Sequence, residues 1–347
     1  MNIPVSLVST VLNDRHGAET LLADLTKQTR LPDEFVVVDG GSADGTYEYL
    51  CEQAKSVPFR LQVIQKKGAN VSRGRNLAID KAAHDVILTT DFGCRLDANW
   101  VKELVAPFEQ DTAVEIVTGS WIIPEQDVQT PAQWAEWALS GGKLELQATP
   151  TCLASTRSIA FKKQVWLDFG KYPEDLTLTG DDAIFSLWMV SAKRKIAAAP
   201  KAICYWHRFP KLKSYWKEAR RNFRGAGEAI FFLNYGIKVG VLLALEMLSL
   251  LTTVTLFVLL GWGGQIWWFG IAIIITMLIW SKRLIRWLTA IQFLSTWGKA
   301  SYWLWIIGLE LGNRINGVVG YWYGFCYGFK RCQGCRVRMQ QLGVRRW

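Results

Sequence analysis

The sequence lacks the features that mark several large protein classes. No nucleic-acid-binding motif occurs in its 347 residues, so the formal net charge of +10 does not by itself indicate a nucleic-acid partner. The first residues, Met1 to Leu7, contain neither a basic segment nor a long apolar run. We therefore expect no signal peptide, and we expect the N-terminal domain to stay in the cytosol.

Cysteine patterns and nucleotide-binding glycine patterns are also sparse. The seven cysteines are scattered, which suits reduced thiols better than a disulfide framework. Cys332 and Cys335 have the spacing of half a zinc site, but no second pair exists, so no zinc site is expected. Gly40, Gly41 and Gly45 do not complete the G-x-G-x-x-G pattern, which makes a Rossmann oxidoreductase a poor fit.

The composition changes along the chain. Up to about residue 230, charged and apolar residues mix as in a soluble domain, whereas the remainder is strongly apolar and rich in tryptophan. Positive charge concentrates in residues 205–224 and 330–346, on either side of the apolar part. This arrangement favours anionic lipid head groups as the partner of the basic segments.

The first part alternates strand-like and helix-like segments. Strand patterns occupy residues 5–10, 34–39, 61–64 and 86–91, and helical patterns lie between them. This order predicts an α/β fold with a doubly wound, mostly parallel, Rossmann-like sheet, whose ligands bind beyond the carboxyl ends of the strands. Asp39 and Asp91 end two strands and should meet at that edge, unless each only orders its turn.

Seven ordered segments resemble the motifs of the family 2 glycosyltransferases of GT-A fold. They are residues 5–13, 28–34, 37–46, 73–79, 155–161, 170–174 and 180–185. As an ordered set they make a specific resemblance, which covers about residues 4–228. It implies a GT-A fold and an inverting transferase that takes a sugar from a nucleotide-sugar donor.

The resemblance also implies the residues of the donor site. Asp39 would contact the nucleobase or ribose, with Thr10 and Asn13 beside it on the first loop. A guanidinium offers fork geometry to the diphosphate. Arg73 and Arg75 are both candidates, but two positions apart on a helix they cannot both face the site. Arg75 fits the Arg-Asn pattern of the family and is favoured.

The metal motif departs from that of the family. Asp-X-Asp is usual at this place, and this chain has Asp91-Phe92-Gly93. Mg²⁺ or Mn²⁺ can still be held by one carboxylate together with substrate phosphates and waters. We hypothesise that His207 assists Asp91 as a metal ligand, against the alternative that it is a structural histidine.

Asp181 and Asp182 open a helix and match the catalytic acid motif of the family. Only one of two adjacent helical side chains faces the sheet edge, and the other is free to cap the helix. Asp182 is the candidate general base and Asp181 its neighbour; the positive helix end favours the ionised carboxylate. The alternative is a capping pair that takes no part in chemistry.

Residues 211–224 alternate basic and aromatic side chains and are predicted to lie on the membrane surface. Within this segment, Arg221 or Arg224 is a second candidate for contact with the diphosphate. The interfacial role is the first interpretation of the segment, and the phosphate contact is its alternative.

The apolar part predicts a transmembrane hairpin formed by Val239–Leu260 and Ile266–Trp280. Lys238 precedes the hairpin and three basic residues follow it, so both ends should be cytoplasmic. This places the catalytic domain on the cytoplasmic face of the inner membrane. Glu246 lies within the first span, where it must be protonated, paired or facing a protein-lined cavity.

The expected organisation has three parts. Residues 1–228 form the cytosolic transferase domain, residues 229–281 the hairpin, and residues 282–347 interfacial amphipathic helices with a basic cytoplasmic tail. The anchor suggests a lipid-linked or membrane-proximal acceptor. The altered metal motif leaves open an alternative, a catalytically silent scaffold that binds sugar nucleotides at the membrane. A polymerising synthase would need further spans and a Gln-x-x-Arg-Trp motif, which are absent.

Overall fold

The computed structural model describes residues 3–149, 155–177, 179–230, 233–260, 266–293 and 302–343. The chain divides into two compact units. We call residues 1–127, 144–207 and 328–345 the sheet unit, and the rest, mainly residues 128–143 and 208–327, the helical unit. These bounds differ from those predicted from composition, because the division falls after residue 207 and inside the last long helix. The functional meaning of the three predicted domains stays a prediction.

The sheet unit is built on one mixed sheet, which has nine strands within the described residues. The strand order is β3-β2-β1-β4-β8-β6-β9-β5, and β7 pairs with β6. The strands are β1 Val5–Val11, β2 Glu34–Asp39, β3 Arg60–Gln65, β4 Val86–Thr89, β5 Cys94–Leu96, β6 Ile116–Ile122, β7 Glu145–Leu146, β8 Ile159–Lys162 and β9 Ile196–Trp206.

Strands β3, β2, β1 and β4 are mutually parallel. Strand β8 enters antiparallel between β4 and β6, and β6 then pairs in parallel with β9. β1 and β2 are rich in β-branched residues and buried along almost their whole length, as expected for strands covered on both faces. The predicted α/β fold is confirmed, but the sheet is mixed: its first half is parallel as predicted, whereas its second half includes antiparallel pairs.

The helices of this unit bury one face against the sheet unit's core, and α1 and α3 begin at side-chain caps. The N-cap Asp14 accepts a hydrogen bond from the Gly17 amide at 2.9 Å, which fixes the start of the first helix. The helices are α1 Arg15–Thr26, α2 Thr46–Gln53, α3 Val71–Lys81, α4 Trp100–Gln110, α6 Lys163–Phe169, α7 Asp181–Ser191 and α13 Gln333–Gln341, with a short 3-10 turn η1 at Glu125–Asp127.

One strand ends earlier than the sequence suggests. β4 stops at Thr89, two residues before Asp91, because the chain turns there and the Cys94 amide donates to the Asp91 carbonyl at 3.2 Å. The short strand β5 follows and pairs antiparallel with β9. Asp91 therefore lies in a turn beyond the strand end, where its side chain is 41% exposed.

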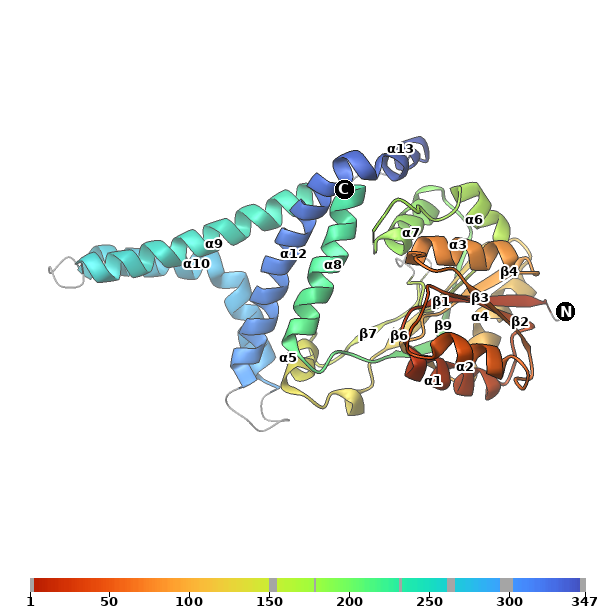
Figure 1. The fold of residues 1–347 in the computed structure, drawn as a ribbon. Helices are drawn as coiled ribbons and strands as arrows, with labels where there is room; N and C mark the ends of the chain where they lie inside the picture. The colour runs from red at the N-terminus through yellow and green to blue at the C-terminus, as the bar shows by residue number, and fades with distance from the viewer. Residues whose placement is uncertain are drawn as a thin grey trace. The chain divides into compact units, whose positions relative to one another are not determined.

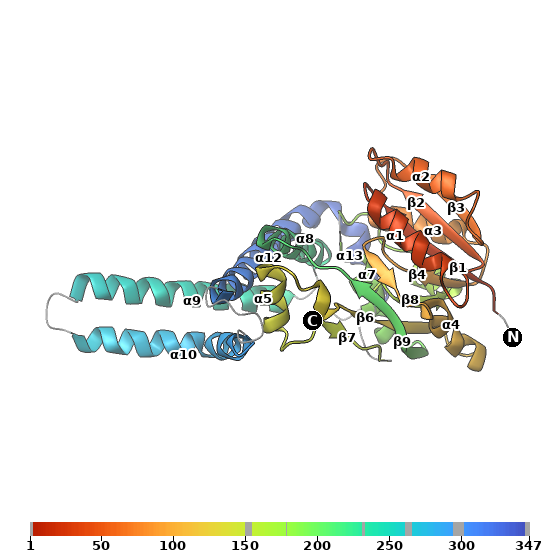
Figure 2. The same ribbon diagram turned by 90° about the horizontal axis from the view of Figure 1, so that it is seen from below.

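The helical unit contains α5 Pro131–Leu139, α8 Leu212–Ala229, α9 Leu233–Leu260, α10 Ile266–Ile291 and most of α12 Trp303–Arg331. Helices α9 and α10 run side by side, as both views show (Figures 1 and 2). Within the described residues, one stretch is long and apolar enough to cross a membrane, Gly236–Leu259 in α9, with a mean hydropathy of 2.2.

Two helices extend the picture that the sequence gives of this unit. α10 continues beyond the apolar run that ends at Trp280, through three basic residues, to Ile291. Within the predicted interfacial region, residues 303–331 form the single helix α12, and its interfacial location stays a prediction. Its charged residues Glu310 and Arg314 make ion pairs with α9 and α10, which explains why the helix is not interrupted there.

Glycines bring α8 and α12 into backbone contact. A Cβ atom at Gly320 would lie 2.2 Å from the Arg220 carbonyl oxygen, and one at Gly324 would lie 2.1 Å from that of Arg224. The G-x-x-x-G spacing of this pair on α12 is typical of helices that pack closely within membranes. The predicted basic surface segment is therefore a helix packed along one face on α12 (Figure 1).

Candidate active site at the strand ends

Asp39 lies at the end of β2 and is fully buried. Its Oδ1 atom accepts hydrogen bonds from the amides of Gly41 at 2.8 Å and Ser42 at 2.9 Å. Its Oδ2 atom is buried and has no hydrogen-bond partner among the residues that the structure describes. One oxygen thus orders the turn while the other is left to accept a hydrogen bond from a ligand, since an unmet buried acceptor is costly.

Asn13 borders the glycine-rich turn, whereas Thr10 lies within β1, opposite Val38 of β2. Asn13 has a left-handed backbone, with a φ of 53°, and its side chain accepts from the Ala43 amide at 2.8 Å. Thr10 lies near α3 because residue 74 is glycine, where a Cβ would come within 2.8 Å of the threonine methyl carbon. Asn13 therefore shapes the turn beyond β2, and Thr10 packs closely against α3.

Arg75 is the arginine of α3 that points into the molecule. It is 6% exposed, and its guanidinium forms a buried ion pair with Asp181 and donates to the Thr156 hydroxyl at 3.3 Å. Arg73 instead lies on the surface, paired with Glu174 at 3.3 Å. The separation of the two arginines follows from helical geometry, as predicted.

Asp91 lies between two guanidinium groups. Its carboxylate is 3.8 Å from Arg75 and 4.0 Å from Arg157. Arg157 also lies over the ring of Trp206, with 3.8 Å between the guanidinium carbon and the ring centroid. This stacking holds the guanidinium plane beside the carboxylate.

Asp181 and Asp182 begin α7 after Gly180, whose φ of 103° disfavours any side chain. Asp181 is 4% exposed and is the partner of Arg75. Burial raises the pKa of Asp182 to about 6, and the Asp181 carboxylate adds to the rise, whereas Arg75 opposes it. Asp182 is thus a carboxylate with a pKa close to neutrality, which is the property a general base needs.

We call Asp91, Asp181, Asp182, Arg75 and Arg157 the strand-end cluster. It joins residues that follow β4, open α7, lie within α3 and precede β8. Burial opposes the charged form of Arg75, but Asp181, Tyr172, Asp91 and Asp182 together outweigh it, so the pKa of Arg75 is raised above its ordinary value. Three carboxylates therefore face two guanidinium groups, and the cluster carries a surplus of negative charge.

His207 lies beside Asp127, with 2.9 Å between its Nδ1 atom and the carboxylate. No contact between His207 and Asp91 occurs among the described residues, so the structure does not bring the two predicted metal ligands together. The metal role of His207 stays a prediction. Arg224 belongs to the helical unit, where it pairs with Glu228 at 2.8 Å and faces the rings of Tyr323 and Tyr327. Its predicted contact with the diphosphate also stays a prediction.

The site offers few protein ligands to a divalent cation. The part of the chain that the structure describes holds no group of three or more His, Cys, Asp or Glu side chains suited to a metal. Asp91 is the partly exposed carboxylate of a cluster with surplus negative charge. One such carboxylate, with substrate phosphates and waters, suffices for Mg²⁺ or Mn²⁺.

Sequence reasoning missed Arg157 and Thr156. Both lie within the segment 155–161 that carried the family resemblance, next to a serine and just before β8. Their roles depend on Trp206 and Arg75, which come from distant parts of the chain. A local pattern could mark the segment but could not show which of its side chains reaches Asp91.

Comparison with known proteins finds similar sequences and a shared fold. Residues 6–163 match the family described as Glycosyl transferase family 2. The chain is 26% identical over 193 residues to O-antigen chain rhamnosyltransferase RfbN of Salmonella typhimurium strain LT2, a match that covers 53% of this chain. The match spans 60% of the length of that relative.

Among solved structures, the mannosyltransferase PcManGT of Pyrobaculum calidifontis, in complex with GDP-Man and Mn²⁺, superposes with a TM-score of 0.56 at 15% identity. The superposition covers 93% of this chain and 88% of that one. The likeness shows that the two chains share a fold.

Proposed function

We propose that this chain is a family 2 glycosyltransferase that moves a sugar from a nucleotide-sugar donor to an acceptor at a membrane. The family match over residues 6–163, the similarity to RfbN and the fold shared with PcManGT support this proposal. The transfer is a single displacement that inverts the anomeric carbon. The observation that carries this proposal is the strand-end cluster, which sets a buried guanidinium beside a carboxylate with a pKa of about 6.

We propose that the donor binds with its nucleoside at Asp39 and its diphosphate at the strand-end cluster. The unpartnered Oδ2 atom of Asp39 accepts a hydrogen bond from the nucleobase or ribose, and Thr10 and Asn13 border that position. The diphosphate lies by Arg75 and Arg157, whose guanidinium groups pair with phosphate oxygens. The complex of PcManGT with GDP-Man and Mn²⁺ supports a nucleotide-sugar donor for this chain.

Asp91 is the residue that would hold Mg²⁺ or Mn²⁺ together with the diphosphate and water. The cation's contribution would be to neutralise the negative charge of the departing nucleoside diphosphate. The negative surplus of the strand-end cluster supports this role, because it disfavours a bare diphosphate and favours one that arrives with a cation. His207 remains the proposed auxiliary ligand.

Asp182 acts as the general base. It takes the proton of the acceptor hydroxyl while that oxygen forms the new bond to the anomeric carbon. The bond from this carbon to the diphosphate breaks on the opposite face, and the diphosphate leaves with the bonding electrons. Asp181 remains ion-paired with Arg75 and so keeps the guanidinium in place.

The acceptor is proposed to be lipid-linked or membrane-proximal. The Gly236–Leu259 stretch of α9 supports a membrane anchor, and the basic residues on both sides of the hairpin support a cytoplasmic active site at the inner membrane. RfbN, named for transfer of rhamnose to an O-antigen chain, supports a glycan intermediate as the acceptor.

The experiment is incubation of the membrane-embedded, full-length protein with a panel of nucleotide sugars, with and without a membrane lipid extract. We expect free nucleoside diphosphate with one donor class and faster release when the extract is present. Calorimetric binding of a donor without any release of nucleoside diphosphate would instead establish the second candidate, a silent sugar-nucleotide-binding scaffold. The variant Asp91-Phe92-Gly93 motif is the observation that favours that candidate.

A further inference from the structure

The helical unit contains a polar pocket of about 820 Å³ lined by residues of α5, α8, α9, α10 and α12. Its wall is unusually charged for helices of such apolar composition. The charged groups include Glu246 from α9, Lys282, Arg283 and Arg286 from α10, and Glu310 and Arg314 from α12.

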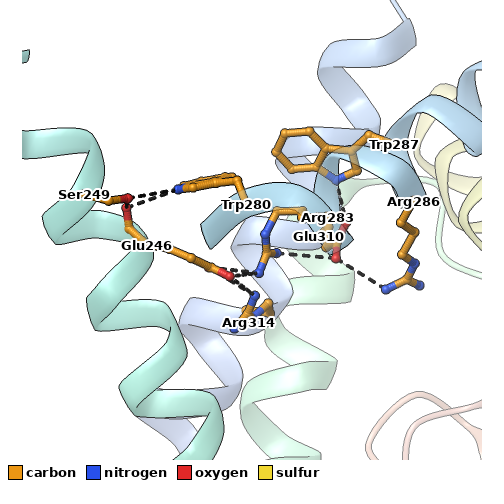
Figure 3. Close-up of polar contacts among 8 residues, drawn as sticks. All are labelled: Glu246, Ser249, Trp280, Arg283, Arg286, Trp287, Glu310 and Arg314. Atoms are coloured by element: carbon orange, nitrogen blue, oxygen red, sulfur yellow. Dashed lines mark hydrogen bonds and ion pairs between the residues drawn. The ribbon is translucent and has the colours of Figure 1, made fainter. Parts of the chain in front are cut away.

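Arg283 lies at the centre of this wall and is 5% exposed. Its guanidinium donates to both Glu246 oxygens, at 2.6 and 2.8 Å, and lies 3.4 Å from Glu310 (Figure 3). Arg314 shares Glu246 at 3.1 Å, and Arg286 shares Glu310 at 3.3 Å. Each carboxylate of this network is thus divided between two arginines.

The wall carries more positive than negative charge. Four cationic side chains face the two shared carboxylates. A third carboxylate in the wall, Glu136, is already held by Arg208, whose Nε and Nη2 atoms donate to it at 2.8 and 2.6 Å. Arg208 does not line the pocket. Lys282 and Arg286 are exposed, so the surplus positive charge of the wall is accessible to an anion.

Two buried polar atoms of the lining residues also lack partners. The Nε–H group of Arg283 and the Oδ1 atom of Asn313 have no hydrogen-bond partner among the residues that the structure describes. A phosphate oxygen is an acceptor that suits a guanidinium N–H. The unmet donor therefore points to the same class of ligand as the surplus charge.

An apolar groove of about 710 Å³ adjoins the polar pocket. It runs between α9 and α10, is lined mostly by apolar side chains such as Leu248 and Trp268, and shares Ile279 with the polar pocket. A charged cavity that continues into an apolar groove matches the two ends of a lipid. A soluble anion would use only the first of them.

We propose that the polar pocket and the apolar groove together bind one membrane lipid with a phosphate head group. The phosphate takes the surplus positive charge of Lys282, Arg283, Arg286 and Arg314, and a hydrocarbon chain lies between α9 and α10. The inference rests on the proposed membrane location and goes beyond the proposed transfer reaction, because it concerns binding and not turnover.

The test uses the full-length protein in a non-ionic detergent and counts bound ligand by native mass spectrometry. Dioctanoyl phosphatidic acid carries head and tails, dioctanoylglycerol carries the same tails alone, and inorganic phosphate is the head alone. We expect one molecule of phosphatidic acid to bind, and each of the two fragments to bind at least about tenfold more weakly.

Variants separate the two ends of the site. Lys282→Gln together with Arg286→Gln should weaken phosphatidic acid about tenfold, since both cations are half-exposed or exposed and are not the centre of the ion network. Thr252→Trp, in the apolar groove, should weaken phosphatidic acid and leave inorganic phosphate unchanged. The control Lys238→Gln removes an exposed cation of α9 that does not line either pocket.

Three results would overturn the proposal: dioctanoylglycerol binding as tightly as phosphatidic acid, inorganic phosphate binding as tightly as the lipid, or no loss of affinity in the Lys282→Gln, Arg286→Gln protein. No donor is present, so the result does not depend on transferase activity. Membrane location is measured separately, as recovery of the protein in the alkali-washed membrane fraction. Absence of the protein from that fraction would contradict the proposed membrane location, and this result is distinct from each of the three binding results.

Discussion

The two units each bury a cluster of arginines and carboxylates, and the clusters differ in the sign of their surplus charge. In the strand-end cluster, Asp91, Asp181 and Asp182 outnumber Arg75 and Arg157. In the wall of the polar pocket, the cations outnumber the two shared carboxylates, Glu246 and Glu310. Arginines and carboxylates thus form two clusters that are suited to ligands of opposite charge.

The difference lies in what each cluster leaves unmet. The strand-end cluster keeps a half-exposed carboxylate, Asp91, and a second carboxylate of raised pKa, Asp182, so it is suited to a cation and to a proton. The pocket wall keeps an unpartnered Arg283 N–H and exposed cations, so it is suited to an anion. Removal of one carboxylate should therefore have different effects on stability in the strand-end cluster and in the wall of the polar pocket.

The largest expected effect is on turnover in Asp182→Asn. The amide cannot accept the acceptor's proton, so kcat should fall about a hundredfold or more, while donor affinity changes less than about twofold. Steady-state kinetics and donor calorimetry measure the two quantities. Asp80→Asn, which changes an exposed aspartate of α3, is the matched control. A retained kcat in Asp182→Asn would remove the mechanism.

Glu246→Gln should destabilise the helical unit by about 3 kcal/mol, because it leaves Arg283 and Arg314 without their shared carboxylate. Asp91→Asn should change the free energy of unfolding by less than about 0.5 kcal/mol, because that carboxylate is half-exposed and belongs to a surplus. Thermal unfolding in detergent compares the two variants. Equal losses of unfolding free energy in the two variants would contradict the proposed difference between the clusters.

Arg157→Gln should weaken donor binding about tenfold, since it removes a guanidinium that would pair with the diphosphate. The fold should persist, because the arginine is partly exposed and its ion pair is long. Arg60→Gln, at the amino end of β3 and thus at the other edge of the sheet, controls for the loss of one positive charge. Unchanged donor affinity in Arg157→Gln would assign Arg157 to orientation of Asp91 alone.

The pH dependence should follow Asp182. Its pKa in the folded protein is raised to about 6, so the carboxylate is ionised and active above this value and is protonated as the pH falls below it. We expect kcat at pH 5 to be about tenfold lower than at pH 7. A kcat that stays level between pH 5 and pH 7 would exclude Asp182 as the base.

Much of the sheet unit could be predicted because its signals are local. The five buried positions of α4 and the inward direction of Arg75 follow from helical periodicity alone. The early end of β4 could not be predicted, because it depends on a turn hydrogen bond between Asp91 and Cys94. Arg157 was missed because its position depends on stacking against Trp206.

The helical unit shows the same limit. The sequence indicates that Glu246 needs a partner, but it does not indicate that Arg283 and Arg314 from two other helices supply it. The same holds for Glu310 and Arg314 of α12, because the sequence does not indicate that their partners lie on α10 and α9. The interfacial location of residues 282–347 stays a prediction.

Turnover in the presence and absence of a divalent cation tests the central claim most directly. With the cognate donor, EDTA should lower the rate at least about tenfold, Mn²⁺ or Mg²⁺ should restore it, and His207→Ala should raise the metal concentration needed for half-maximal rate. Metal dependence unchanged in His207→Ala would remove that histidine only. Full turnover in EDTA would contradict the account, because the negative strand-end cluster would then accept the diphosphate without a cation.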